Sequence, residues 1–131
     1  MKIASVLENQ KFEKRIAITP EIAKKYISLG FEVFLHENYG NHLGILDEEY
    51  KNLGVKISND DKEILKDASI IVQLGLLSDE KYSLLKNDQT LIGVFNPYDN
   101  KDKLNELVKK KINIFSLELL PRITRAQSMD I

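Results

Sequence analysis

Short apolar runs alternate with helix-like segments along the chain, and this alternation restricts the possible folds more than any other feature. The runs are rich in β-branched residues, as buried strands are, and the segments between them carry apolar residues at helical spacing. Because the runs are apolar on both faces, they indicate parallel strands covered by helices on both sides of a sheet. The expected strands are residues 2–7, 31–36, 69–74, 90–95 and 112–117.

Helix signals lie between these runs. Thr19 and Pro20 form a cap and a first turn, and Gly30 is a stop signal for the helix that they begin. Ser78 and Asn100 are expected to cap two later helices. The other expected helices cover residues 47–53, 60–66, 80–86 and 101–110. The sequence therefore predicts an α/β fold: a doubly wound, mostly parallel, flavodoxin-like or Rossmann-like sheet of about five strands with right-handed crossovers.

Charge and residue usage exclude several functional classes. The chain has 19 basic and 20 acidic residues, so we expect no nucleic-acid partner, since such binding needs a basic excess. Without cysteine there is no disulfide and no thiolate metal site. His36 and His42 lack further ligands at useful spacing, so no metal site is expected. No apolar run approaches the roughly 18–20 residues that span a bilayer.

Polar loops follow the expected strands, and two of them contain all the arginines of the chain. Ligands of an open parallel sheet bind beyond the carboxyl ends of its strands. Residues 8–18 carry Arg15, and residues 118–130 carry Arg122 and Arg125. An arginine fork matches planar carboxylates and carboxamides better than lysine does. We therefore expect a ligand site between these loops, the alternative for Arg15 being an ion pair with Glu8 or Glu13.

Familiar nucleotide and nucleophile motifs are absent from the sequence. None of the six glycines forms G-x-G-x-x-G or a P-loop, so no pyrophosphate cradle is recognisable. No serine has the context of a nucleophile elbow. The residues after Thr124 look like the opening of another helix, and we expect the fold to be incomplete at the C-terminal end of the sequence.

Two stretches resemble a known family. Residues 121–130, Pro-Arg-Ile-Thr-Arg-Ala-Gln-Ser-Met-Asp, resemble the signature loop in the NAD(H)-binding domain of proton-translocating nicotinamide nucleotide transhydrogenases. Residues 15–20, Arg-Ile-Ala-Ile-Thr-Pro, are similar to an R-x-A-x-x-P stretch shared by these enzymes and alanine dehydrogenase, and Asn96-Pro97 also suits this superfamily. The resemblance covers the whole chain but only the first portion of the family's nucleotide domain.

The resemblance implies an enzyme that transfers hydride between NAD(H) and NADP(H), coupled to proton translocation in the complete enzyme. It implies that Arg122 and Asp130 hold the nicotinamide and its carboxamide, while Gln127 reaches toward the second nucleotide as the catalytic candidate. Arg15 and Arg125 are further candidates for cofactor binding. A carboxamide offers donors and an acceptor, so an acid and an arginine together satisfy it. Hydride transfer then requires mainly that two rings be positioned face to face.

The resemblance also implies a larger assembly. Residues 1–131 would be the N-terminal subdomain of a two-part NAD(H)-binding domain, whose glycine-fingerprint Rossmann half is absent from this chain. The implied partners are that half, an NADP(H)-binding domain and a membrane proton-channel domain, in an enzyme that is a dimer. The implied location is cytoplasmic and peripheral to the inner membrane through the rest of the enzyme.

Two alternatives remain open. One is a fragment of an alanine-dehydrogenase-like, NAD-dependent amino-acid dehydrogenase. Those enzymes use a lysine in the region of residues 71–74 and a histidine near residues 95–97, which here read Ile-Val-Gln-Leu and Phe-Asn-Pro. The other is a non-enzymatic flavodoxin-like module. A receiver of that kind needs acids after the first strand and an aspartate after the third, where this sequence has Glu8-Asn9 and Leu74-Gly75.

Overall fold

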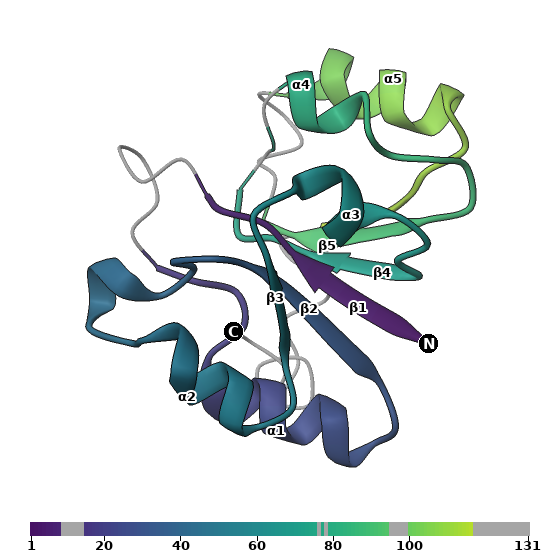
Figure 1. The fold of residues 1–131 in the computed structure, drawn as a ribbon. Coiled ribbons are helices and arrows are strands. Elements are labelled where there is room, and N and C mark those ends of the chain that lie inside the picture. Colours follow the sequence, from purple (N-terminus) through teal and green to yellow (C-terminus); the bar gives the residue numbers. More distant parts are fainter. Residues whose placement is uncertain (9–14, 76, 78, 95–99, 117–131) are drawn as a thin grey trace, which may run out of the picture.

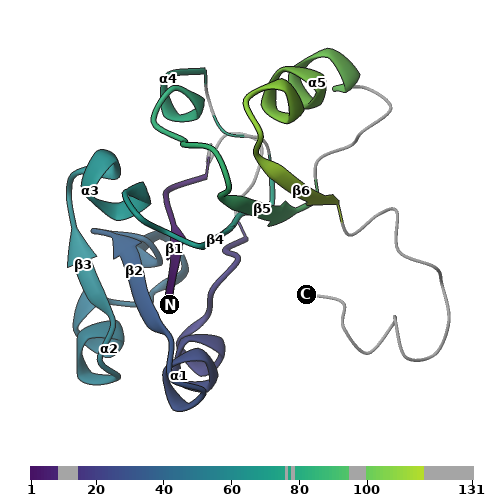
Figure 2. The ribbon, with the colours of Figure 1, turned by 90° about the vertical axis from the view of Figure 1, so that its right-hand side faces the viewer.

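The computed structural model describes residues 1–8, 15–75, 77, 79–94 and 100–116. Within these ranges six parallel strands form one sheet in the order β3-β2-β1-β4-β5-β6 (Figures 1 and 2). The strands are β1 Lys2–Ser5, β2 Glu32–His36, β3 Lys56–Ser58, β4 Ile70–Val72, β5 Thr90–Gly93 and β6 Asn113–Ser116. The doubly wound parallel sheet that the sequence predicts is confirmed, with a sixth strand, β3, added at one edge.

Helices cover both faces of this sheet. They are α1 Pro20–Ser28, α2 Asp47–Asn52, α3 Asp61–Leu65, α4 Asp79–Tyr82 and α5 Lys101–Lys109, with a 3₁₀ turn, η1, at Asn41–Leu43. Helices α1 and α2 lie on one face, and α3, α4 and α5 lie on the other (Figures 1 and 2). No helix in the described ranges has the length and apolar character needed to cross a bilayer.

The helix ends follow the local sequence signals in part. Thr19 caps α1, because its hydroxyl oxygen accepts a hydrogen bond from the Ile22 N–H at 3.3 Å. After α1 the chain turns through Gly30, whose φ of 95° lies in the left-handed region that favours glycine. Asn100 occupies the N-cap position of α5, as expected, but its side chain makes no capping hydrogen bond. Ser78, the other expected cap, lies outside the described residues.

Two apolar cores lie on the two faces because successive strand residues point in opposite directions. In β1, Ile3 packs with the core under α1 and α2, while Ala4 packs with the core under α3, α4 and α5. Tyr39 and Tyr50 meet edge to face in the first core, with ring centroids 6.1 Å apart. This arrangement holds β1 rigidly at the centre of the sheet, so the loop that follows it starts from a fixed point.

Candidate functional site

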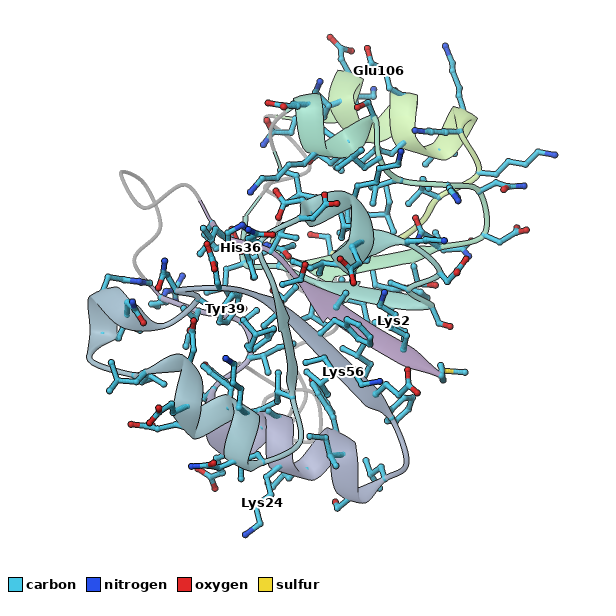
Figure 3. All side chains as sticks on the ribbon, in the orientation of Figure 1. Lys2, Lys24, His36, Tyr39, Lys56 and Glu106 are labelled. Carbon is cyan, nitrogen blue, oxygen red and sulfur yellow. The ribbon has the colours of Figure 1, made fainter. Side chains whose placement is uncertain are left out.

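The order of the strands reverses between β1 and β4, and this switch point marks the candidate site. All strands are parallel, so their carboxyl ends lie along one edge of the sheet. Polar side chains from three loops meet at this edge, and Figure 3 shows His36 and Tyr39 there, away from Lys2 and Lys56 at the amino ends of β1 and β3. The edge therefore has the position that ligand sites occupy in folds of this type.

A buried hydroxyl pair connects the end of β1 with the loop after β2. Tyr39 Oη lies 2.8 Å from Ser5 Oγ and accepts hydrogen bonds from the backbone N–H groups of Ala17 and Ile18 at 3.2 and 3.3 Å. Because Tyr39 Oη already accepts from two donors, its own proton is directed at Ser5 Oγ. Burial raises the pKa of Tyr39 to about 12, so the phenol stays neutral at physiological pH. The hydroxyl pair therefore has a structural role, and it cannot act as a general base at neutral pH.

Gln73 joins the same network from the end of β4. Its Oε1 accepts from the Val6 N–H at 2.8 Å and from Ser5 Oγ at 3.0 Å, and its Nε2 donates to the Val6 carbonyl oxygen at 3.1 Å. The side chain is completely buried. A lysine at this position could donate but could not accept the Val6 N–H. The Gln73 amide therefore satisfies both the N–H and the carbonyl group of Val6. The lysine that alanine dehydrogenases are expected to have in this stretch is absent.

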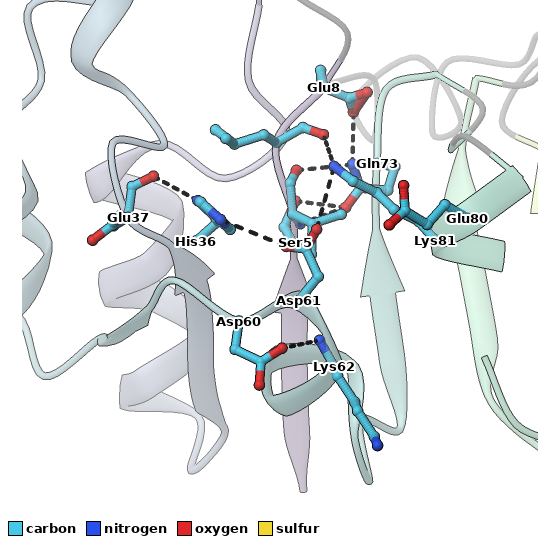
Figure 4. A network of polar contacts seen from close by, with 12 residues as sticks. Ser5, Glu8, His36, Glu37, Asp60, Asp61, Lys62, Gln73, Glu80 and Lys81 are labelled. Carbon is cyan, nitrogen blue, oxygen red and sulfur yellow. Dashed lines mark hydrogen bonds and ion pairs between the residues drawn. The ribbon is translucent and has the colours of Figure 1, made fainter. Parts of the chain in front are cut away.

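Glu8 places a carboxylate at the switch point itself (Figure 4). Its Oε1 accepts from the Leu74 N–H and, at 3.0 Å, from Gln73 Nε2, while its Oε2 lies 3.3 Å from the Gly75 N–H. These donors come from the end of β4, whereas Glu8 follows β1. The carboxylate thus bridges the two loops that diverge at the switch point.

A second polar cluster flanks the site on the α3 side of the sheet. His36 Nε2 lies 3.8 Å from Asp61 Oδ1, and Lys81 Nζ lies 3.7 Å from Asp61 Oδ2 (Figure 4). Lys81 also donates to the Leu7 carbonyl oxygen at 2.9 Å. Because His36 Nδ1 lies 2.7 Å from the Glu37 carbonyl oxygen, that nitrogen carries a proton. Among the described residues no group of three or more His, Cys, Asp or Glu side chains could hold a metal ion.

Arg15 lies in the connection between β1 and α1, exposed to solvent. The next residues are fixed at the carboxyl edge, since the N–H groups of Ala17 and Ile18 bond to Tyr39. Arg15 is therefore on the edge that the sequence indicates, and its role in binding stays a prediction. The other candidates lie outside the described residues: Arg122, Arg125, Gln127 and Asp130.

A separate hollow lies on the opposite edge of the sheet. It has a volume of about 470 Å³ and is lined in part by Lys2, Phe34 and Glu63. Lys2 donates to the carbonyl oxygens of Glu63 and Lys66 and lies 4.0 Å from the centre of the Phe34 ring. Partial burial lowers the pKa of Lys2, although nearby acids oppose this change. Since the hollow lies at the amino ends of the strands and its lysine is already engaged, it is not the candidate site.

Sequence reasoning missed the polar network, although a local signal was present. Ser5 and Gln73 are polar residues inside otherwise apolar strand segments, and both are buried. Tyr39 is an aromatic residue in a loop that otherwise reads as polar. Buried polar residues are hydrogen-bonded in folded proteins. A polar residue that interrupts a buried strand therefore indicates a partner, but the partner's identity depends on the strand order.

The strand order and the two helical layers define the class of protein: a doubly wound α/β domain with the strand arrangement of dinucleotide-binding folds. Residues 6–131 match the model of the alanine dehydrogenase/PNT N-terminal domain, and the chain belongs to this family. The expectation from the two sequence motifs is thereby confirmed at the level of the family.

Known relatives agree over nearly the full chain. It is 41% identical, over 99% of its length, to an NAD(P) transhydrogenase alpha-subunit chain of Rickettsia prowazekii, and covers 35% of that protein. It also matches the crystal structure of a transhydrogenase from Sinorhizobium meliloti with a TM-score of 0.92 and 31% identity, covering 99% of this chain and 39% of that one. The chain thus spans little more than a third of the length of these two relatives.

Likeness to alanine dehydrogenase is weaker. The chain is 26% identical to the alanine dehydrogenase of Methanococcus maripaludis over 96% of its own length, covering 34% of that protein. The chain is therefore more similar to transhydrogenase subunits than to alanine dehydrogenases. The presence of Gln73 at the end of β4, where alanine dehydrogenases are expected to have a lysine, agrees with this result.

Proposed function

We propose that this chain is the N-terminal portion of the NAD(H)-binding domain of a proton-translocating NAD(P) transhydrogenase. In the complete enzyme, hydride passes between NAD(H) and NADP(H). The observation that carries the proposal is the agreement with a transhydrogenase structure over 99% of the chain at 31% identity. This agreement covers nearly the whole chain, with a TM-score of 0.92.

The chemistry of the described edge supports this reaction class. Ser5, Tyr39 and Gln73 form a neutral, buried network that engages its own backbone. No pair among them is suited to exchange protons with a substrate at neutral pH. Hydride transfer between two nicotinamide rings needs positioning and orientation, and the cofactors themselves supply the chemistry. A buried network that contains no acid–base pair of its own fits that requirement.

The proposal assigns roles to residues of the motif at 121–130. Arg122 and Asp130 hold the nicotinamide carboxamide, and Gln127 reaches toward the nucleotide on the partner domain. Arg125 and Arg15 are additional contacts to the cofactor. We propose that the NADP(H)-binding and membrane proton-channel domains are partners in a dimeric enzyme, peripheral to the inner membrane on its cytoplasmic side through its other domains.

The absence of a glycine motif from the sequence supports a two-part domain organisation. No G-x-G-x-x-G occurs in these 131 residues, so the pyrophosphate of the cofactor needs another source of backbone donors. We propose that a second, glycine-fingerprint half supplies them and completes the NAD(H) site. Residues 1–131 are then one half of a two-part nucleotide domain.

The test uses two variants of the complete enzyme and separates binding from transfer. Arg122→Ala weakens NADH binding by about 1.5–3 kcal/mol, because a charge-assisted contact is lost. Gln127→Asn leaves NADH binding nearly intact but slows transfer about a hundredfold, since a shift of about 1 Å between the rings is sufficient. Lys24→Ala, at an exposed position of α1, is the matched control and changes neither.

The measurements are NADH affinity by calorimetry and single-turnover hydride transfer to NADP⁺. Unchanged transfer in Gln127→Asn would contradict the assigned role of the motif. Reduction of NAD⁺ by L-alanine, without any transfer between nucleotides, would instead favour the amino-acid dehydrogenase.

A further inference from the structure

The polar cluster beside α3 contains a carboxylate oxygen that lacks a hydrogen-bond donor. Asp61 Oδ1, in the first turn of α3, is buried, and no donor reaches it from the residues that the structure describes. Buried polar atoms in folded proteins nearly always have a partner, and a buried charge needs one more than a neutral group does. The other oxygen, Oδ2, lies 3.7 Å from Lys81 Nζ, so the lysine compensates only one side of the carboxylate.

The His36 ring is positioned to supply the missing donor. Its Nε2 faces Asp61 Oδ1 at 3.8 Å, about 1 Å beyond a charge-assisted hydrogen bond (Figure 4). Its Nδ1 lies 2.7 Å from the Glu37 carbonyl oxygen, which can only accept, so Nδ1 keeps its proton. In the neutral ring Nε2 then carries a lone pair and has no proton to donate. Only the doubly protonated, positively charged ring donates to the Glu37 carbonyl oxygen and to Asp61 Oδ1 together.

The described elements around the His36 ring carry more acidic than basic side chains. Ser58, its partner on β3, is neutral and contacts the Glu63 carboxylate at 3.3 Å. Helix α4 presents Lys81, which opposes a second positive charge, but the Asp61 carboxylate lies between this ammonium group and the ring. The charged side chains on these elements are Glu8 after β1, Glu37 after β2, Lys56 on β3, Asp60, Asp61, Lys62 and Glu63 at α3, and Glu80 and Lys81 on α4.

We propose that His36 is a proton-sensitive link between β2 and α3: when its ring takes up a second proton, Nε2–H donates to Asp61 Oδ1 and ties the end of β2 to the first turn of α3. An ordinary histidine is mostly charged at about pH 5.5 and mostly neutral at about pH 8. Because proton uptake forms the link, its contribution to stability is present in mildly acidic solution and is lost as the pH rises through the titration of His36. No nucleotide takes part in this link, so its test is separate from that of the proposed function.

A double-mutant cycle measures this link at two pH values. The wild type, His36→Asn, Asp61→Ala and the double variant are prepared as the full chain. In His36→Asn the short amide keeps a polar group near the position of Nδ1 and removes Nε2. Urea unfolding is followed by circular dichroism at about pH 5.5 and at about pH 8, at equal ionic strength. The cycle cancels the effects that each substitution has alone, including the loss of the Lys81 contact and the titration of other groups.

The expected coupling between the two residues depends on pH. At about pH 5.5 the pair changes the unfolding equilibrium constant by roughly fivefold, and at about pH 8 by less than about twofold. This size lies between that of an exposed ion pair and that of a buried charged hydrogen bond, because the side chains of His36 and Asp61 are 18% and 23% exposed. His42→Asn is the matched control, because His42 is the other histidine of the chain and is exposed in η1. Combined with Asp61→Ala, this control shows no pH-dependent coupling.

A second measurement uses the unaltered chain, so it does not depend on whether the variants fold. Correlation of the ring ¹⁵N and ¹H signals by NMR at about pH 8 identifies which nitrogen of the neutral His36 ring carries the proton. We expect Nδ1, because the Glu37 carbonyl oxygen accepts from it. A proton on Nε2 would overturn the proposal, since Asp61 Oδ1 would then have its donor without proton uptake. A coupling that is equal at the two pH values, or below about twofold at both, would also overturn it.

Discussion

Replacing Tyr39 with phenylalanine removes one oxygen atom from the centre of the buried network and leaves the ring in place. The hydroxyl accepts from the N–H groups of Ala17 and Ile18 at 3.2 and 3.3 Å and contacts Ser5 Oγ at 2.8 Å. The ring is buried and packs edge to face against Tyr50. Tyr39→Phe therefore tests the hydrogen bonds with little change in packing.

The magnitude follows from the groups left without a partner. A buried donor that loses its acceptor costs about 1–3 kcal/mol. Both backbone bonds to Tyr39 are long, so the lower part of that range applies to each, and the loss for the two donors is about 2–4 kcal/mol. The N–H groups of Ala17 and Ile18 cannot reach water without movement of the β1–α1 connection, which also carries Arg15. We therefore expect both lower stability and a less ordered connection.

Urea unfolding of the full chain, followed by circular dichroism, measures the loss. Tyr26→Phe is the control, because Tyr26 is only half-buried and packs at the edge of the same core. We expect the control to lie within about 0.5 kcal/mol of the wild type. A Tyr39→Phe variant as stable as this control would refute the reasoning, since the hydrogen bonds would then contribute nothing net.

Three further predictions concern pH, the amide at the end of β4 and cofactor binding. Burial raises the pKa of Tyr39 from 10.0 to about 12. The stability that the neutral, buried phenol contributes is therefore complete below pH 10 and is lost as the pH rises toward 12. In urea titrations over this window, the free energy of unfolding should fall more steeply for the wild type than for Tyr39→Phe, by up to about 1.4 kcal/mol per pH unit. Gln73→Lys should lower the free energy of unfolding by about 1–3 kcal/mol in the same assay, because the Val6 N–H loses its acceptor. The control Lys62→Gln, on α3, should change the free energy of unfolding by less than about 0.5 kcal/mol. The isolated chain should show no saturable NADH binding at micromolar concentrations by calorimetry, since it lacks a glycine fingerprint, and tight binding would contradict the need for a second half.

The fold class could be predicted because the signal is local. Apolar runs of four or more residues and capped helices such as α1 are visible within short windows of sequence. β3 was missed because it has three residues, of which only Ile57 is apolar, too few for any alternation to show. The expected helix at residues 80–86 is shorter in the structure, where α4 ends at Tyr82 and the chain bends again at Asp88 with a φ of 70°.

From the sequence, the site could be located only to the carboxyl edge of the sheet, and not to the residues that form it. The arginine positions indicate the carboxyl ends of the strands, and Arg15 does lie there. The network itself joins Ser5 to residues 34 and 68 positions away, Tyr39 and Gln73. Separations of this size carry no local pattern, and the pairing depends on β1 lying between β2 and β4. Residue types therefore indicate where a ligand approaches, but the strand order decides which polar groups meet.

The two bonds between Gln73 and Val6 have a consequence for strand register. β1 and β4 are aligned by only two residue pairs, Ile3 with Ile70 and Ala4 with Ile71. So short a parallel ladder could slip by one position, which would exchange the faces that its side chains point to. Because the Gln73 amide offers a donor and an acceptor to Val6, it extends the ladder by the equivalent of one more backbone rung. A slipped alignment would lose both bonds inside the core, so this single side chain selects one alignment of the sheet's two halves.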